Sequence, residues 1–241
     1  LSAVDVTTGM SMSCVVKHKG ATDYAVNELQ RFVLEVGRSN GVLQSDQEPA
    51  IRALCREAAT KRNMTTRLVP VYSSRSQGGV ERWHKELRGH CKVLKETIQE
   101  NYEIKLGVKR PLVTWIAQHA SWLHNRYQLH HDGMTSYQRR WNEIYNKPIY
   151  ELGETVLFHW PAGVPDKTTP SWTKGIWLGR CAQSDEHFVG TKEAVYRTRS
   201  IKRLPIPERY DTGLINENSS TPWATRGVGK ADTNEFVLQG L

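Results

Sequence analysis

The sequence predicts a mixed α/β domain over residues 1–147, followed by a small β-barrel over residues 148–204. Three observations support this division. Strand-like and helix-like apolar periods alternate along the first part, whereas short alternating runs separated by turn residues follow Pro148. Residues 205–241 contain few large apolar side chains and are expected to form a disordered or linker tail. A chain of 241 residues is long enough for one domain of roughly 150 residues and a smaller companion.

The elements of the first domain follow from apolar spacing and turn chemistry. We expect a hairpin of residues 1–6 and 10–17, a helix over 21–36, a buried strand over 41–45, a helix opening at Pro49, a strand over 67–71, and helices over 81–99 and 111–127. Strands alternating with helices predict an α/β sheet covered on both faces, whose ligands gather at strand ends. Trp115 and Trp122 are seven positions apart on one helix side, which is more typical of core than of a base-stacking surface.

The second domain is predicted from four short alternating runs. These runs cover residues 155–159, 175–181, 188–191 and 195–203. Turns rich in Gly, Pro, Asp and Ser separate them, as in a small barrel.

Charge and cysteine usage limit the classes of partner. Residues 1–150 hold 22 Lys and Arg against 14 Asp and Glu, whereas the tail is slightly acidic, so a polyanionic partner is expected on the first domain. The four cysteines form no CxxC pair, which favours a reducing compartment and no disulfide framework. No apolar run approaches the roughly 20 residues that cross a bilayer, so we expect no membrane partner.

Two carboxylates are the candidate metal ligands. Asp46 follows the predicted strand of residues 41–45, and Glu81 opens a helix after Gly78 and Gly79. Carboxylates at one sheet edge form an oxygen-rich site that suits Mg²⁺ or Mn²⁺ rather than zinc. Such a site can hold two metals about 4 Å apart and act on a phosphodiester.

The helix after Glu81 carries a row of basic residues. Lys85, Arg88 and Lys92 follow Glu81 by four, seven and eleven positions, so they share its face, and Arg82 lies beside them. A metal-binding acid beside a basic row is the pattern that a DNA backbone entering a metal site requires. The alternative is an ordinary surface pair between Glu81 and Lys85, worth a few tenths of a kcal/mol.

These residues resemble a known family. Residues 76–82, Ser-Gln-Gly-Gly-Val-Glu-Arg, resemble the segment around the last catalytic glutamate of retroviral and retrotransposon integrases, which are DDE polynucleotidyl transferases. Ser45-Asp46 resembles the strand end with their second aspartate, and residues 133–137 resemble a later Gly-x-Thr-Pro-Tyr element. The resemblance covers about residues 1–145. Residues 151–204 are similar, more weakly, to the SH3-like barrel that follows the core.

The resemblance implies a ribonuclease-H-like fold and metal-dependent joining of element DNA ends to target DNA. It assigns Asp46 and Glu81 to catalysis and metal binding, with Mg²⁺ or Mn²⁺ as cofactor, and Lys85 and Arg88 to contact with the DNA end. We expect Arg82 and Lys92 to bind DNA as members of the same basic row. It further implies a fragment of a retroelement Pol polyprotein that forms a homo-oligomer and acts in the nucleus after a cytoplasmic phase. The chain departs from the family at Gln47-Glu48-Pro49, where Asn-Gly or Arg-Gly is usual, and at Ser136, where proline is usual.

Asp5 is a tempting third carboxylate, but the sequence favours a structural role. In the resembled fold two further antiparallel strands follow the first catalytic strand, and only one fits between Asp5 and the helix at Ala21. We therefore expect the first strand and its aspartate to lie upstream of Leu1, and residues 1–241 alone to be inactive. The alternative functions are a catalytically inactive DNA-binding remnant and a ribonuclease-H-like nuclease.

Overall fold

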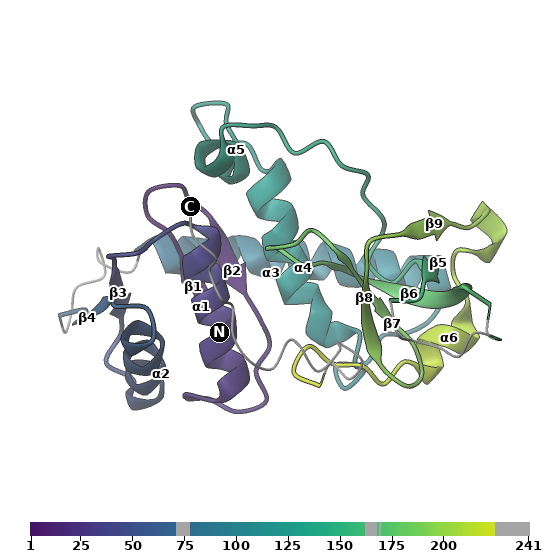
Figure 1. Ribbon diagram of the computed structural model, residues 1–241, viewed down its shortest axis with the longest axis horizontal. Coiled ribbons are helices and arrows are strands. Elements are labelled where there is room, and N and C mark those ends of the chain that lie inside the picture. The colour runs from purple at the N-terminus through teal and green to yellow at the C-terminus, as the bar shows by residue number, and fades with distance from the viewer. Residues whose placement is uncertain (71–77, 162–167, 169, 225–241) are drawn as a thin grey trace.

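The computed structural model describes residues 1–70, 78–161, 168 and 170–224. Two small strand pairs and two helices occupy one end of the molecule, and a five-stranded sheet occupies the other (Figure 1). The long helices α3 (Gly78–Tyr102) and α4 (Val113–Tyr127) lie between the two ends. The predicted order, an α/β part followed by a β part, is confirmed.

The α/β part starts with a hairpin and continues with two strand–helix steps. Its elements are β1 (Ser2–Val4), β2 (Ser11–Ser13), α1 (Asp23–Glu35), β3 (Val42–Ser45), α2 (Pro49–Thr60) and β4 (Thr65–Leu68). Thr22 caps α1 by accepting a hydrogen bond from the Ala25 amide, and Pro49 opens α2. One apolar core, which includes Met10, Val26 and Leu54, joins β2, α1 and α2.

The strands of this part form two ladders of different sense. β1 pairs with β2 in antiparallel register, and β3 pairs with β4 in parallel register. Strands of both senses flanked by helices confirm the predicted mixed α/β class, and in the described residues β1–β2 and β3–β4 form separate ladders. The prediction that residues 41–45 form a buried strand is wrong, because Val42 is 54% exposed and β3 pairs only with β4 among the described residues.

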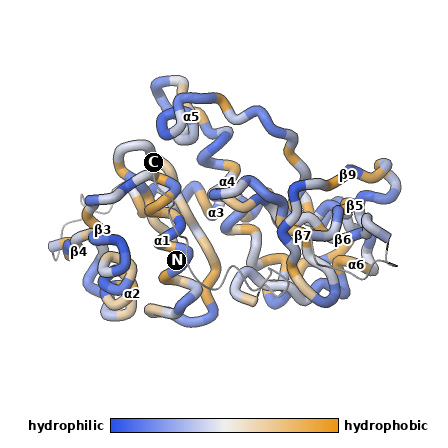
Figure 2. The backbone as a smooth tube through the Cα atoms, viewed as in Figure 1, coloured by the Kyte–Doolittle hydropathy of each residue, from blue (hydrophilic) through white to orange (hydrophobic). Residues whose placement is uncertain are grey.

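Helices α3 and α4 link the two parts. Trp83, Ile98 and Tyr102 form the buried side of α3, and most of α4 is buried. Both hydrophobic and hydrophilic residues occur along α4 (Figure 2). Trp115 and Trp122 are 1% and 4% exposed, which confirms that they belong to the core. After α4, the short helix α5 (Ser136–Trp141) begins with a capping box between Thr135 and Gln138.

The second part is one antiparallel sheet of five strands. They are β5 (Thr155–His159), β6 (Trp172–Arg180), β7 (His187–Gly190), β8 (Val195–Thr198) and β9 (Ile201–Arg203). The order is β8-β7-β6-β5-β9, so the last strand returns to pair with the first. Phe158 and Trp177 are fully buried inside this sheet. The predicted strand over 195–203 is divided into β8 and β9 by Arg199 and Ser200.

The start of the predicted tail is folded, which corrects the expectation of a disordered or linker segment over residues 205–241. A 3-10 turn covers Ile206–Glu208, and helix α6 covers Thr212–Glu217. Ile215 is buried in a core that includes Ile98, Trp115 and Leu178, and the Trp115 indole donates to the Ser220 carbonyl at 3.0 Å. A few well-placed apolar residues are therefore enough to dock this polar segment. Residues 225–241 lie outside the described residues.

Candidate metal and nucleic-acid site

Asp46 stands where β3 ends and α2 is about to begin. Its Oδ1 accepts a hydrogen bond from the Glu48 amide at 3.1 Å, which shapes the turn before Pro49. The side chain is exposed, and no ion pair within the described residues engages it. Asp46 thus has the predicted place at the carboxyl end of a parallel strand, with oxygen lone pairs available to a ligand.

Glu81 lies in the first turn of α3 and is exposed. Its carboxylate has no hydrogen bond or ion pair in the described part of the chain, so the alternative of a Glu81–Lys85 pair is not seen there. An acidic residue at this position is also favoured by the partial positive charge of a helix N-terminus. The helix starts at Gly78, so Gly78 and Gly79 are part of its first turn rather than of a preceding loop. The expected loop over residues 72–77 lies outside the described residues.

Asp46 and Glu81 supply donors of the type that Mg²⁺ and Mn²⁺ prefer. No group of three or more His, Cys, Asp or Glu side chains suited to a metal ion occurs among the residues that the structure describes. These two carboxylates are of the type that a hard cation requires, but the described residues form no metal site around them.

The basic row along α3 is exposed, as predicted. Arg82, Lys85, Arg88 and Lys92 all lie on the solvent side of the helix. Two of them have local partners, since Arg88 donates to the His84 carbonyl at 3.2 Å and Lys92 lies 3.9 Å from Glu96. Exposed pairs of this kind are weak, so the row keeps its positive charge available for an anionic partner.

Trp83 fixes the orientation of this row, a role that was not predicted from the sequence pattern. It is 3% exposed, and its indole Nε1 donates to the Ser13 hydroxyl of β2 at 2.9 Å. Its ring lies 4.6 Å from the ring of His124 on α4. Because Trp83 faces inward, Arg82, Lys85 and Arg88 face outward.

Asp5 is held by structural contacts. Arg38 donates to both carboxylate oxygens of Asp5 at 3.0 Å, and the Thr8 amide and hydroxyl donate to Oδ2 at 2.8 and 2.7 Å. Burial by itself would raise the pKa of Asp5, but the hydrogen bonds from Arg38 and Thr8 outweigh it and hold that pKa below its usual range. These contacts support the structural role expected from the sequence. Arg38, the partner, was not anticipated because it is remote in sequence.

Two histidines of α4 are buried. His119 and His124 are 3% and 6% exposed. Burial lowers the pKa of His119 to about 3. Burial, together with His90 and His130, lowers the pKa of His124 to about 4. Both rings are therefore neutral at pH 7.

Basic residues of the second sheet are largely engaged with acids. Arg203 donates to both carboxylate oxygens of the fully buried Glu154 at 2.7 Å, and Arg199 donates to Glu186 at 3.2 Å. Lys202 lies over the Trp172 ring at 4.1 Å. Arg203 in particular has a structural function, so α3 is the stronger candidate for contact with nucleic acid.

Comparisons with known proteins give weak likenesses only. No family model matches the chain, and no curated protein matches it. Among solved structures, a chain of the simian T-cell lymphotropic virus intasome in complex with the PP2A regulatory subunit B56 gamma is 18% identical, with a TM-score of 0.44; the match covers 84% of this chain and 70% of that one. The catalytic core domain of BIV integrase is 21% identical, with a TM-score of 0.44, over 58% of this chain and 84% of that one. At these values neither likeness carries an argument about chemistry.

Proposed function

We propose that this chain is the core and barrel of an integrase-type polynucleotidyl transferase, a class of enzyme that joins element DNA ends to target DNA, and that it binds DNA along α3. The observation that carries the proposal is the exposed face of α3, where an acid without a partner among the described residues is followed by Lys85, Arg88 and Lys92. The sequence resemblance around Glu81 and Asp46 supports the same function.

The proposed roles follow from exposure and charge. Lys85, Arg88 and Lys92 bind the phosphate backbone without reading its sequence. Asp46 and Glu81 hold Mg²⁺ or Mn²⁺, which when bound activates the attacking oxygen and stabilises the leaving one. Trp83 positions the helix so that its basic face stays toward the DNA.

A second candidate function is a DNA-binding remnant without catalysis. Arg38 donates to both carboxylate oxygens of Asp5, so Asp5 is not available to a metal. Asp46 and Glu81 are then the only two candidate metal ligands among the described residues, which favours this second function. We therefore propose that residues 1–241 bind DNA and a divalent cation but do not join strands. A nuclease of the same fold is the further alternative, and cleavage without joining would identify it.

Manganese binding tests the proposal directly. Protein-bound Mn²⁺ enhances the relaxation of water protons, so a titration of this signal gives the Mn²⁺ affinity. The affinity is expected to fall at least about tenfold in Asp46→Asn and in Glu81→Gln. Glu100→Gln is the matched control, because Glu100 is also an exposed acid on α3. Equal Mn²⁺ binding by all four proteins would reject Asp46 and Glu81 as a shared metal site.

The same proteins test the choice between functions. DNA ends and target DNA are incubated with Mg²⁺ and the unmodified chain, and joined and nicked products are separated by electrophoresis. DNA binding without product is expected. Joining by residues 1–241 that persists in Asp46→Asn would overturn the assignment of this aspartate.

A further inference from the structure

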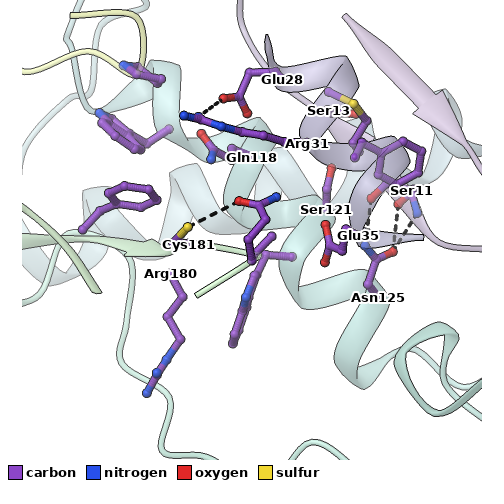
Figure 3. Close-up of a pocket in the computed structure, with 18 of the residues that line it drawn as sticks. Ser11, Ser13, Glu28, Arg31, Glu35, Gln118, Ser121, Asn125, Arg180 and Cys181 are labelled. Carbon is purple, nitrogen blue, oxygen red and sulfur yellow. Dashed lines mark hydrogen bonds and ion pairs between the residues drawn. The ribbon is translucent and has the colours of Figure 1, made fainter. Parts of the chain in front are cut away.

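A cavity of about 180 Å³ lies between the α/β part and the five-stranded sheet. One wall is α1, another is α4, and the third is the end of β6 with the turn after it (Figure 3). Glu28, Arg31 and Glu35 lie on one side of α1, and Gln118 and Ser121 lie on the facing side of α4. The volume is several times the roughly 30 Å³ that one water molecule occupies in the liquid.

Each charged side chain that lines this cavity lies near an opposite charge, although Asp185 is shared with Lys147 and Glu186 with Arg199. Arg31 donates to Glu28 at 2.6 Å, and Arg126 lies 3.6 Å from Glu35. Arg180 lies 3.1 Å from Asp185, and Arg197 lies 3.9 Å from Glu186. Burial raises the pKa of Glu28 and Glu35, against the opposing effect of their arginine partners. Whether they are paired or protonated, these carboxyls leave no net negative charge for a cation.

Several polar atoms of the lining nevertheless lack a partner. Gln118 Oε1 is a buried acceptor, and Trp122 Nε1 and Arg180 Nε are buried donors, none with a hydrogen bond among the described residues. Trp122 and Arg180 are only 4% and 7% exposed. Leaving such groups without partners is costly, so acceptors and donors on the same cavity call for a molecule that offers both.

The remaining lining is apolar and aromatic. Phe32 on α1, Trp115 on α4 and Phe188 on β7 line the cavity, and the rings of Trp115 and Phe188 lie 5.5 Å apart. Aromatic walls favour a flat occupant over a flexible chain. A free ion would lose its hydration without gaining an unpaired opposite charge.

We propose that this cavity binds a small, uncharged, flat molecule that carries both a hydrogen-bond donor and an acceptor, the class of aromatic amides and lactams. Gln118 Oε1 accepts from its donor, and Trp122 Nε1 donates to its acceptor. The site is separate from Asp46, Glu81 and the basic row, so it stands independently of the proposed function. Because the cavity has walls from both parts of the protein, the occupant also ties the sheet to α1 and α4.

Three probes of nearly the same shape test the charge requirement. Benzamide is neutral, benzamidine is a cation and benzoate is an anion. Protein NMR titrations of residues 1–241 at pH 7 are expected to give benzamide a dissociation constant of about 1 mM, with both ions at least about tenfold weaker. Shifted amides should include residues of α1, α4 and the turn after β6. Benzamide should also raise the thermal unfolding midpoint, since a ligand of the folded state stabilises it.

Gln118→Met locates the binding site. It keeps the shape of the side chain but removes the acceptor, so benzamide affinity is expected to fall at least about fivefold while the fold is kept. Gln128→Met is the control, because Gln128 is exposed just beyond the same helix and outside the cavity lining. Stronger binding of benzamidine or benzoate would overturn the uncharged class. No binding of any probe would show that the cavity holds only water. Equal binding by Gln118→Met would show that benzamide binds at another place, which also overturns the proposal.

Discussion

The indole of Trp83 donates its Nε1 hydrogen to the hydroxyl of Ser13 at 2.9 Å, which ties α3 to β2 across 70 positions of sequence. Trp83 is also only two positions after Glu81. The first turn of α3 therefore has a buried side, which Trp83 anchors, and an exposed side, which carries Glu81 and Arg82. The orientation of the candidate site depends on this one buried side chain.

Substitution of Trp83 is expected to destabilise the fold in two steps. Trp83→Phe keeps the ring packing but leaves the Ser13 hydroxyl without its donor, and should lower the free energy of unfolding by about 1 kcal/mol. Trp83→Ala removes the ring and should cost about 3–5 kcal/mol. Urea unfolding measures both, and Trp141→Phe is the control because Trp141 is 46% exposed. Equal stability of Trp83→Phe and the unmodified protein would show that the hydrogen bond contributes nothing.

Particular residues show which features of the fold and of the candidate site could be predicted from the sequence. Apolar periods predicted α1, α2, α4 and β5 closely, and α1 and α2 each bury one regular stripe. Asp46 at a strand end and the exposed face of Lys85 and Arg88 follow from local pattern alone. The contacts of Trp83 with Ser13 and of Asp5 with Arg38 could not be predicted, because each joins residues far apart in sequence. The docking of Ile215 was missed for the same reason, since its neighbours in sequence are polar.

Asp5→Asn separates a structural role from a catalytic one. The amide cannot accept charge-assisted hydrogen bonds from Arg38, so we expect a loss of about 1–3 kcal/mol in the free energy of unfolding. Because the pKa of Asp5 is held below its usual range in the folded state, its contribution is present above about pH 4 and is lost as the pH falls through the folded pKa. Asp5→Asn should therefore flatten the acid side of the stability curve.

DNA and Mn²⁺ binding complete this test. Both should be unchanged in Asp5→Asn at pH 7 and at a temperature where the variant is folded. Asp132→Asn is the control, because Asp132 also pairs with an arginine, Arg139, but is more exposed. Loss of Mn²⁺ binding without loss of stability would make Asp5 a metal ligand instead.

Buried histidines predict a second pH dependence, between neutral pH and about pH 4. In the folded protein burial lowers the pKa of His124 to about 4 and that of His119 to about 3, whereas an unfolded histidine titrates near 6.5. The unfolded state thus binds more protons in this window, so stability is full above about pH 6.5 and falls as the pH decreases. Each such histidine can remove up to about 1.4 kcal/mol per pH unit.

His124→Phe tests the contribution of one ring. Phenylalanine keeps the packing against Trp83 and cannot be protonated, so the slope of unfolding free energy between pH 6.5 and 4 should decrease. His18→Phe serves as control, since His18 is exposed. An identical slope in His124→Phe would place the titrating group elsewhere.

The salt dependence of DNA binding tests the basic row on α3. Replacing Lys85, Arg88 and Lys92 by alanine removes three charges, and should weaken binding to every DNA sequence by a similar factor, because phosphate contacts carry no sequence information. The slope of log K against log salt should become shallower by about 2.7, from about 0.9 for each lost phosphate contact. Fluorescence anisotropy at several salt concentrations measures the slope.

A control variant with alanine at Lys17, Lys61 and Lys109 loses the same charge from exposed positions outside α3. An equal change of slope in the two variants would mean that only net charge attracts the DNA, and an unchanged slope in the α3 variant would move the DNA path to another surface.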